Sequence, residues 1–161
     1  MGGAAPVIFT TAAELRGALP EGGVLLGIDL GTKTIGTALS DAGWRFATAG
    51  KTLARGKFSR DLEAIRAVVA DRRAAGIVLG LPLNMDGSEG PRAQSARAYA
   101  RNLAPLALPV LLWDERWSTT SAERDLVAQD WSRTKRKDRI DSHAAAIILQ
   151  AALDALTGGL F

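Results

Sequence analysis

Acidic side chains follow two apolar runs that have the pattern of buried strands. Asp29 is the next-to-last residue of the run 24–30, and Glu115 follows the run 109–113 directly after Asp114. A carboxylate at the end of a buried strand is costly to desolvate unless something compensates its charge. Because parallel strands expose their carboxyl ends at one edge of a sheet, we expect Asp29 and Glu115 to face the same crevice.

A third carboxylate, Asp141, is expected near the start of the last long helix. Three converging carboxylates repel one another, and a hard cation neutralises such a set. Mg²⁺ or Mn²⁺ suits oxygen ligands, and two such ions can activate water and stabilise the leaving oxygen of a phosphodiester. The chain has no cysteine and a single histidine, His143, which disfavours zinc.

Each carboxylate also has an ordinary structural explanation. Asp29 could form a turn by accepting a hydrogen bond from its own backbone. Glu115 could pair with Arg116 at the surface, where such pairs contribute little. Asp141 could serve only to favour the positive end of a helix dipole. These alternatives stay open at the level of single residues.

Basic residues gather in one stretch near the C-terminus. Five of them fall within residues 133–139: Arg133, Lys135, Arg136, Lys137 and Arg139. Clustered cations bind a polyanion because its condensed counterions are released, although a solvated loop would have the same composition. We expect this segment to be a loop and, with Lys33 and Arg116, to contact backbone phosphates.

The polar stretch 82–91 is a second candidate for substrate contact. It follows the apolar run 76–81 and contains Asn84, Asp86 and Ser88. These side chains could contact substrate, and Asn84 is the strongest candidate. An Asx-type turn with Gly87 in a left-handed conformation explains the same residues equally well.

The composition of the chain is that of one globular domain. Of its 161 residues, 47% are hydrophobic and 23% are charged, and the net charge is +3. No apolar run reaches the roughly 18 residues of a membrane span, and residues 1–10 lack the basic start of a signal peptide. We expect a cytoplasmic protein that binds nucleic acid and no membrane, with its oligomeric state open.

The elements that must position these residues follow from hydrophobic spacing. An antiparallel meander is expected over residues 24–30, 34–40 and 44–49, and two parallel strands over 76–81 and 109–113. Helices are expected over about 59–73, 91–103, 118–129 and 138–156. The pattern predicts an α/β fold with a mixed five-stranded sheet and helices on both faces. Residues 1–23 are expected to be an extension with a short helix after Thr11, and 24–161 a single domain.

Four segments together resemble the YqgF (RuvX-type) family. They are residues 27–36 (GIDLGTKTIG), 80–87 (GLPLNMDG), 113–120 (WDERWSTT) and 138–150 (DRIDSHAAAIILQ). Their order and spacing make the combination highly specific. The resemblance implies an RNase H-like fold and a nuclease that processes the 5′ end of pre-16S rRNA. It also implies that Asp29, Glu115 and Asp141 are the catalytic carboxylates and hold a divalent metal.

One geometric difficulty follows from the expected strand order. The strand with Asp29 should be central, with residues 76–81 beside it and 109–113 one strand further out. At about 4.8 Å per strand, Glu115 then starts about 10 Å from Asp29. The strand between them offers Gly80 and Leu81 and no carboxylate. The Glu115 side chain must therefore reach inward, or substrate and metals must close the gap.

Three hypotheses compete for the function. The first is a metal-dependent endonuclease acting on precursor rRNA or, as a Holliday-junction resolvase, on branched DNA. The second is a non-catalytic nucleic-acid-binding module on the same fold. The third is an ATPase of the actin, Hsp70 or sugar-kinase type, because residues 29–34 look like their first phosphate loop. The chain lacks the second domain and second phosphate loop which those proteins need.

Overall fold

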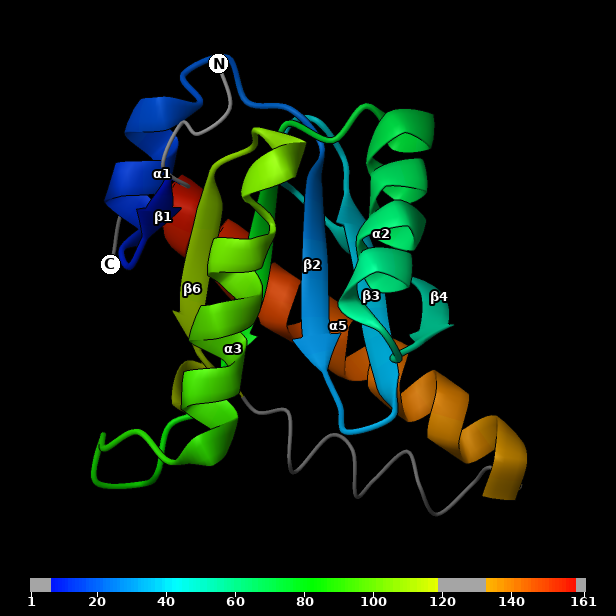
Figure 1. The fold of residues 1–161 in the computed structure, drawn as a ribbon. Coiled ribbons are helices and arrows are strands. Elements are labelled where there is room, and N and C mark those ends of the chain that lie inside the picture. The colour runs from blue at the N-terminus through cyan, green and yellow to red at the C-terminus, as the bar shows by residue number, and fades with distance from the viewer. Residues whose placement is uncertain (1–6, 119–132, 159–161) are drawn as a thin grey trace.

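A computed structural model describes residues 7–118 and 133–158, and the side chains of the second range from residue 142 onward. A six-stranded sheet has the order β1-β6-β5-β2-β3-β4. The helices α2 and α3 cover one face, and α5 crosses the other face diagonally (Figure 1). The mixed α/β class with helices on both faces is as predicted, but the sheet has six strands instead of five.

The antiparallel half of the sheet consists of β2 (Leu25–Leu30), β3 (Thr34–Ser40) and β4 (Ala47–Ala54). β4 was predicted at residues 44–49, and that prediction is wrong at its start. Asp41 Oδ1 accepts hydrogen bonds from the backbone N–H groups of Arg45 (2.8 Å) and Phe46 (2.9 Å), which prolongs the turn. Trp44 lies inside that turn with a φ of 60°, so the strand begins three residues later.

The parallel half contains α2 (Phe58–Arg72), β5 (Gly76–Leu81), α3 (Pro91–Asn102), a short 3₁₀ helix η1 (Ala104–Leu106) and β6 (Val110–Asp114). β5 pairs in parallel with β2 on one side and with β6 on the other. β5 and β6 are buried along their whole length, as expected of strands covered on both faces. The carboxyl ends of β2, β5 and β6 therefore meet at one edge, as predicted (Figure 1).

The sixth strand comes from the N-terminal segment. β1 (Ile8–Phe9) pairs in parallel with β6. It is followed by α1 (Ala12–Ala18), the short helix expected after Thr11. A capping box begins this helix: Thr11 Oγ1 accepts from the Glu14 N–H at 3.2 Å, and Glu14 Oε1 accepts from the Thr11 N–H at 3.1 Å. Ala12 and Leu15 are buried in the core beneath α5. A two-residue strand has too little periodicity to be recognised in the sequence.

The helix α5 (Arg133–Gly158) closes the second face of the sheet. A Cβ built on Gly27 of β2 would lie 2.9 Å from the Leu149 Cβ, so the helix lies close against the sheet. Gln150 fixes it to the start of β4, accepting from the Ala47 N–H at 2.9 Å. None of the described helices is both long and apolar enough to cross a membrane.

Two sequence predictions concern the segment before α5. The basic residues from Arg133 onward were predicted in a loop, but their backbone forms the first turns of α5, which starts five residues before the predicted residue 138. Most of the helix predicted over residues 118–129 lies outside the described residues.

Candidate active site

Asp29 is next to last in β2 and only 3% exposed. Its side chain lies on the α5 side of the sheet, because alternate residues of a strand share a face and Gly27 faces α5. In the parallel register of β2 and β5, Ile28 pairs with Leu79. The residues that follow on the two strands are Asp29 and Gly80, which are therefore neighbours at the carboxyl edge.

Glu115 begins the 3₁₀ helix η2 (Glu115–Trp117) and extends over Gly80. A Cβ built on Gly80 would lie 3.2 Å from Glu115 Cδ and 3.0 Å from Cδ1 of Ile148, which belongs to α5. The missing side chain at Gly80 thus leaves the space that the Glu115 carboxyl group occupies on the α5 side. Since neighbouring strands are about 4.8 Å apart, this carboxyl group lies about one strand spacing from Asp29 and not two. The Glu115 side chain therefore extends inward over β5, as the strand order requires.

Asp114, the residue before Glu115, has a different environment. It ends β6, is 5% exposed, and accepts hydrogen bonds from the Arg116 backbone N–H at 2.9 Å and from Nη2 of the same residue at 2.7 Å. The side-chain hydrogen bond to Asp114 raises the pKa of Arg116 above its ordinary value. Asp114 therefore caps η2 and neutralises Arg116, while Glu115 turns toward the site.

The predicted substrate-contacting loop is held by its own hydrogen bonds. Asp86 Oδ1 accepts from the N–H of Ser88 at 2.9 Å, and Gly87 has a φ of 87°, so the Asx-type turn is formed. Asn84 Nδ2 donates to Ser88 Oγ at 2.9 Å. Arg116 Nη1 joins the loop by donating to the Met85 carbonyl at 3.2 Å. The bond from the Ser88 hydroxyl lowers the pKa of Asp86. Substrate contact by Asn84 or Arg116 stays a prediction.

Arginines gather on the α3 side of the same edge. Arg55 Nη1 donates to the Gly31 carbonyl at 2.7 Å, and its Nη2 donates to Ser95 Oγ at 3.2 Å. Arg92 Nη2 donates to the Leu30 carbonyl at 3.3 Å. Both arginines line a cavity of about 180 Å³ that continues along the turn after β2 and the start of α3. Two cations therefore lie against the two residues that follow Asp29.

Arg55 is supported from behind by a buried polar group. Its guanidinium carbon lies 5.4 Å from the centroid of the Tyr99 ring. The Tyr99 hydroxyl donates to Asp61 Oδ2 at 3.1 Å, and Asp61 Oδ1 accepts from the Gly56 N–H at 3.0 Å. Burial, with the negative charge of Asp61, raises the pKa of Tyr99, so the hydroxyl stays protonated.

The remaining predicted site residues are placed only in part. Lys33 is exposed in the turn between β2 and β3, where its carbonyl accepts from the Arg55 N–H at 2.9 Å. Asp141 and the basic residues Arg133, Lys135, Arg136 and Lys137 lie in α5 by their backbone, and their side chains are outside the described residues. Just after Asp141, the Ser142 hydroxyl lies 2.6 Å from Thr52 Oγ1 of β4. This contact holds the part of α5 just after Asp141 against β4.

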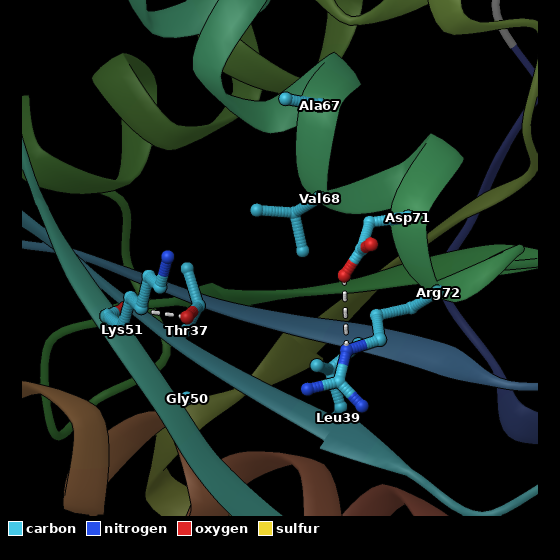
Figure 2. A pocket seen from close by; sticks show the side chains of 8 residues that line it. All are labelled: Thr37, Leu39, Gly50, Lys51, Ala67, Val68, Asp71 and Arg72. Carbon is cyan, nitrogen blue, oxygen red and sulfur yellow. Dashed lines mark hydrogen bonds and ion pairs between the residues drawn. The ribbon is translucent and has the colours of Figure 1, made fainter.

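The described residues contain a larger cavity, of about 460 Å³, away from the candidate site. It lies between α2 and the strands β3 and β4, and its lining includes Thr37, Leu39 and Val68 (Figure 2). Arg72, one of the basic residues that line it, forms an ion pair with Asp71 at 3.4 Å. Of the predicted catalytic residues whose side chains the structure describes, neither Asp29 nor Glu115 lines this cavity.

Sequence reasoning missed Gly80, Arg55 and Arg92. Gly80 was recognised only as a strand end without a carboxylate, although an empty side-chain position is what the geometry needs. Arg55 and Arg92 are 37 positions apart, and no local sequence pattern connects them. The absence of acidic residues in the first turn of α3 was the one available signal, because a helix N-terminus usually attracts negative charge.

Comparison with known proteins identifies the family of this chain. A family model described as "RuvX: Holliday junction resolvase" matches residues 23–155. The chain belongs to the RuvX family. The "Putative pre-16S rRNA nuclease" of Novosphingobium aromaticivorans is 64% identical over 155 residues, covering 96% of this chain and 100% of the relative. A relative of the same name from Sphingopyxis alaskensis is 62% identical over 151 residues, covering 94% and 99%.

Solved structures show the same fold at low sequence identity. The RuvC of T. thermophilus in complex with Holliday junction substrate is 15% identical, with a TM-score of 0.57, and the match covers 84% of this chain and 96% of that one. A second Thermus thermophilus RuvC structure has a TM-score of 0.51 at 15% identity. This RuvX chain therefore has the RNase H-like fold predicted from its sequence. The coverage of 96% with the Novosphingobium relative also includes most of the segment before residue 23, which the family model leaves out.

Proposed function

We propose that this RuvX chain is a cytoplasmic, metal-dependent endonuclease that hydrolyses phosphodiester bonds, with the 5′ end of pre-16S rRNA as its substrate. One observation carries the proposal: the Glu115 carboxyl group occupies the space over Gly80, beside the end of β2 where Asp29 lies. The names of the relatives from Novosphingobium and Sphingopyxis support the choice of rRNA as substrate.

Asp29 and Glu115 orient the attacking water in this proposal. Their oxygens accept hydrogen bonds from a water placed opposite the leaving oxygen, and one carboxylate takes its proton as the new O–P bond forms. The bond from phosphorus to the leaving oxygen breaks, and that oxygen is protonated from solvent. Ile148 and the buried residues of α5 close the inner side of the site, so the carboxylates are reached from the sheet edge.

The donor set fits a divalent metal with oxygen ligands. Asp29 and Glu115 converge from neighbouring elements and offer carboxylate oxygens, the donors that Mg²⁺ and Mn²⁺ prefer. No group of three metal-ligating side chains occurs among the described residues, and we assign the third ligand to Asp141 on α5. Two ions held by these carboxylates would neutralise charge on the phosphate and acidify the attacking water.

Cleavage assays with both candidate substrates test the proposal. Precursor 16S rRNA and a four-way DNA junction are incubated side by side with Mg²⁺ or Mn²⁺, using wild type, Asp29→Asn and Glu115→Gln. We expect wild type to cut the rRNA precursor, and each variant to lose at least about 1000-fold in rate, since both act on the same transition state. The matched control is Asp71→Asn, an exposed carboxylate of α2 far from the edge, which should cut like wild type.

Other outcomes identify the competing functions. Cleavage of the junction alone would favour the resolvase activity named in the family description. Nucleic-acid binding that is insensitive to EDTA, with neither substrate cut, would favour a non-catalytic module. Undiminished cleavage by Asp29→Asn would remove the active site proposed here.

A further inference from the structure

We propose that the cavity between the end of β2 and the start of α3 binds a backbone phosphate of the nucleic-acid strand, with Arg55 and Arg92 as its ligands. This inference rests on the proposed nuclease function and names a contact that none of the predicted substrate residues supplies. The phosphate is a neighbour of the scissile one along the same strand, and it lies on the opposite side of the sheet edge from Glu115.

The two guanidinium groups are held in place by neutral acceptors. Arg55 donates to the Gly31 carbonyl and the Ser95 hydroxyl, and Arg92 donates to the Leu30 carbonyl. An arginine has five N–H donors, so both side chains keep donors for a ligand. The half-buried Arg55 is further restrained by the Tyr99 ring beneath it. Arg55 is therefore held in place before any substrate arrives, and one hydrogen bond directs Arg92 to the same cavity.

The positive charge of this cavity is not neutralised by its neighbours. The ion pairs formed within the described residues engage Arg66, Arg72, Arg97 and Arg116, and neither Arg55 nor Arg92 is among them. The described lining of the cavity contains no acidic residue: it consists of Leu30, Gly31, Thr32, Arg55, Pro82, Pro91, Arg92, Ser95 and Ala96. Two converging arginines with spare donors match the oxygens of a phosphate.

The start of α3 also favours the binding of a phosphate in this cavity. The helix is 12 residues long, begins at Pro91 beside the cavity, and has no acidic residue in its first turn. The positive end of its dipole therefore faces a cavity whose described lining has no carboxylate. A cavity of about 180 Å³ holds several water molecules and so has room for a phosphate group.

The distance to the carboxylates suits a neighbouring phosphate. Gly31 is two residues after Asp29, and Arg55 Nη1 lies 2.7 Å from its carbonyl oxygen. Consecutive Cα atoms are about 3.8 Å apart, so this guanidinium lies within about 13 Å of the Asp29 Cα. A strand that crosses the sheet edge would present its scissile phosphate to Asp29 and Glu115, and a phosphate one or two nucleotides away to the arginines.

Binding measured without cleavage tests the inference. The probe is a fluorescein-labelled single-stranded RNA, titrated in EDTA over a range of salt concentrations and followed by fluorescence anisotropy. The variants are Arg92→Gln, which removes charge from an exposed side chain, Arg92→Lys, which keeps it, and Arg101→Gln. Arg101 is an exposed arginine of α3 outside the cavity, so its variant has the same change in net charge.

We expect Arg92→Gln to weaken binding about 5- to 10-fold and to lower the slope of log affinity against log salt by about 0.7, the value for one phosphate contact on a single strand. Arg92→Lys should keep the slope, and Arg101→Gln should keep both affinity and slope. Arg55→Gln should act in the same direction as Arg92→Gln, with thermal unfolding measured to separate a loss of fold. Equal losses in Arg92→Gln and Arg101→Gln would overturn the inference.

Two further comparisons distinguish a backbone phosphate from a terminal one, and the phosphate site from the nuclease function. RNA with a 5′-hydroxyl and RNA with a 5′-phosphate should lose affinity equally in Arg92→Gln; a loss confined to the 5′-phosphorylated RNA would replace the backbone phosphate with a terminal one and overturn the inference. If Asp29→Asn abolishes cleavage but Arg92→Gln binds as Arg101→Gln does, the inference fails and the nuclease function stands. If no substrate is cut but the Arg92 effects appear, the nuclease function fails and the phosphate site stands.

Discussion

The carboxyl edge of the sheet carries carboxylates on the α5 side and arginines on the α3 side. Asp29 and Glu115 lie on the first side, Asp29 beside Gly80 and Glu115 over it. Arg55 and Arg92 line the cavity on the second side. The acidic side suits hydrolysis of a phosphodiester, and the basic side suits holding its strand. The sheet separates the two sets because Asp29 points to the α5 face, whereas Arg55 follows β4 and Arg92 belongs to α3 on the other face.

The consecutive residues Asp114 and Glu115 repeat this contrast on a smaller scale. Asp114 is enclosed by hydrogen bonds from Arg116, while Glu115 leaves the strand and turns over Gly80. The role of a carboxylate near a site therefore depends on what its side chain contacts, and its place in a sequence motif does not decide that role.

Among variants that leave the carboxylates themselves in place, the largest expected effect comes from Gly80→Ala, which disturbs the acidic side. The new methyl group would lie 3.2 Å from Glu115 Cδ and 3.3 Å from its Cγ, so the carboxyl group must move. We expect the cleavage rate to fall about 100-fold, because such a displacement misplaces a catalytic group, while RNA binding in EDTA stays at the wild-type level. Gly56→Ala, which meets nothing within 4 Å, is the matched control and should cut normally.

Asp114→Asn tests whether Asp114 stabilises the fold without taking part in cleavage. The substitution removes charge from a buried group that accepts hydrogen bonds from Arg116, and we expect it to destabilise the fold by about 2 kcal/mol. Cleavage per folded molecule should stay close to wild type, in contrast to Glu115→Gln. Chemical denaturation and activity assays on the same samples separate the two effects. A large loss of activity with unchanged stability would show that Asp114 belongs to the site.

Tyr99→Phe probes the support of the basic side. The variant keeps the ring under Arg55 but removes the hydroxyl that donates to Asp61, and we expect a loss of about 1 kcal/mol in the free energy of unfolding. The pKa of Tyr99 is raised in the folded protein, so the stabilising protonated form is fully present below the unfolded pKa of about 10. The difference between wild type and variant should therefore stay constant up to about pH 9 and shrink only above the unfolded pKa.

Thr11→Ala should have the smallest effect. Thr11 lies far from both the acidic and the basic side of the edge. The substitution removes the N-cap of α1, where Thr11 Oγ1 accepts from the Glu14 N–H, and should lower stability by about 0.5–1 kcal/mol. Neither cleavage nor the salt dependence of RNA binding should change, so this variant measures how far global stability alone affects those assays. Thr11→Ser, which keeps the cap, should unfold at the wild-type midpoint.

Much of the fold could be predicted because its central strands are continuous apolar runs. The sequence of β2 and β5 indicates burial on both faces, and their order places Asp29 at the carboxyl edge. The start of β4 could not be predicted, because it depends on the hydrogen bonds of Asp41 to the turn before it. β1 is stabilised by its pairing with β6 and not by any pattern of its own.

The candidate site could be predicted as a set of residue types but not as a geometry. Asp29 and Glu115 follow strands and are visible in the sequence. Only the register of β5 shows why Glu115 can extend over Gly80, since that needs an absent side chain next to Asp29. Arg55 and Arg92 meet through backbone carbonyls after β2, a contact that no local sequence pattern encodes. Asp141 stays a prediction.

The order of the elements along the chain has a consequence for synthesis. The face that bears Asp29 is covered by Ala145, Ile148 and Leu149 of α5, and α5 follows β2, β5 and β6 in the sequence. Synthesis proceeds from the N-terminus, so the face under α2 and α3 can be covered before the face under α5. The acidic side of the edge is then completed after the basic side.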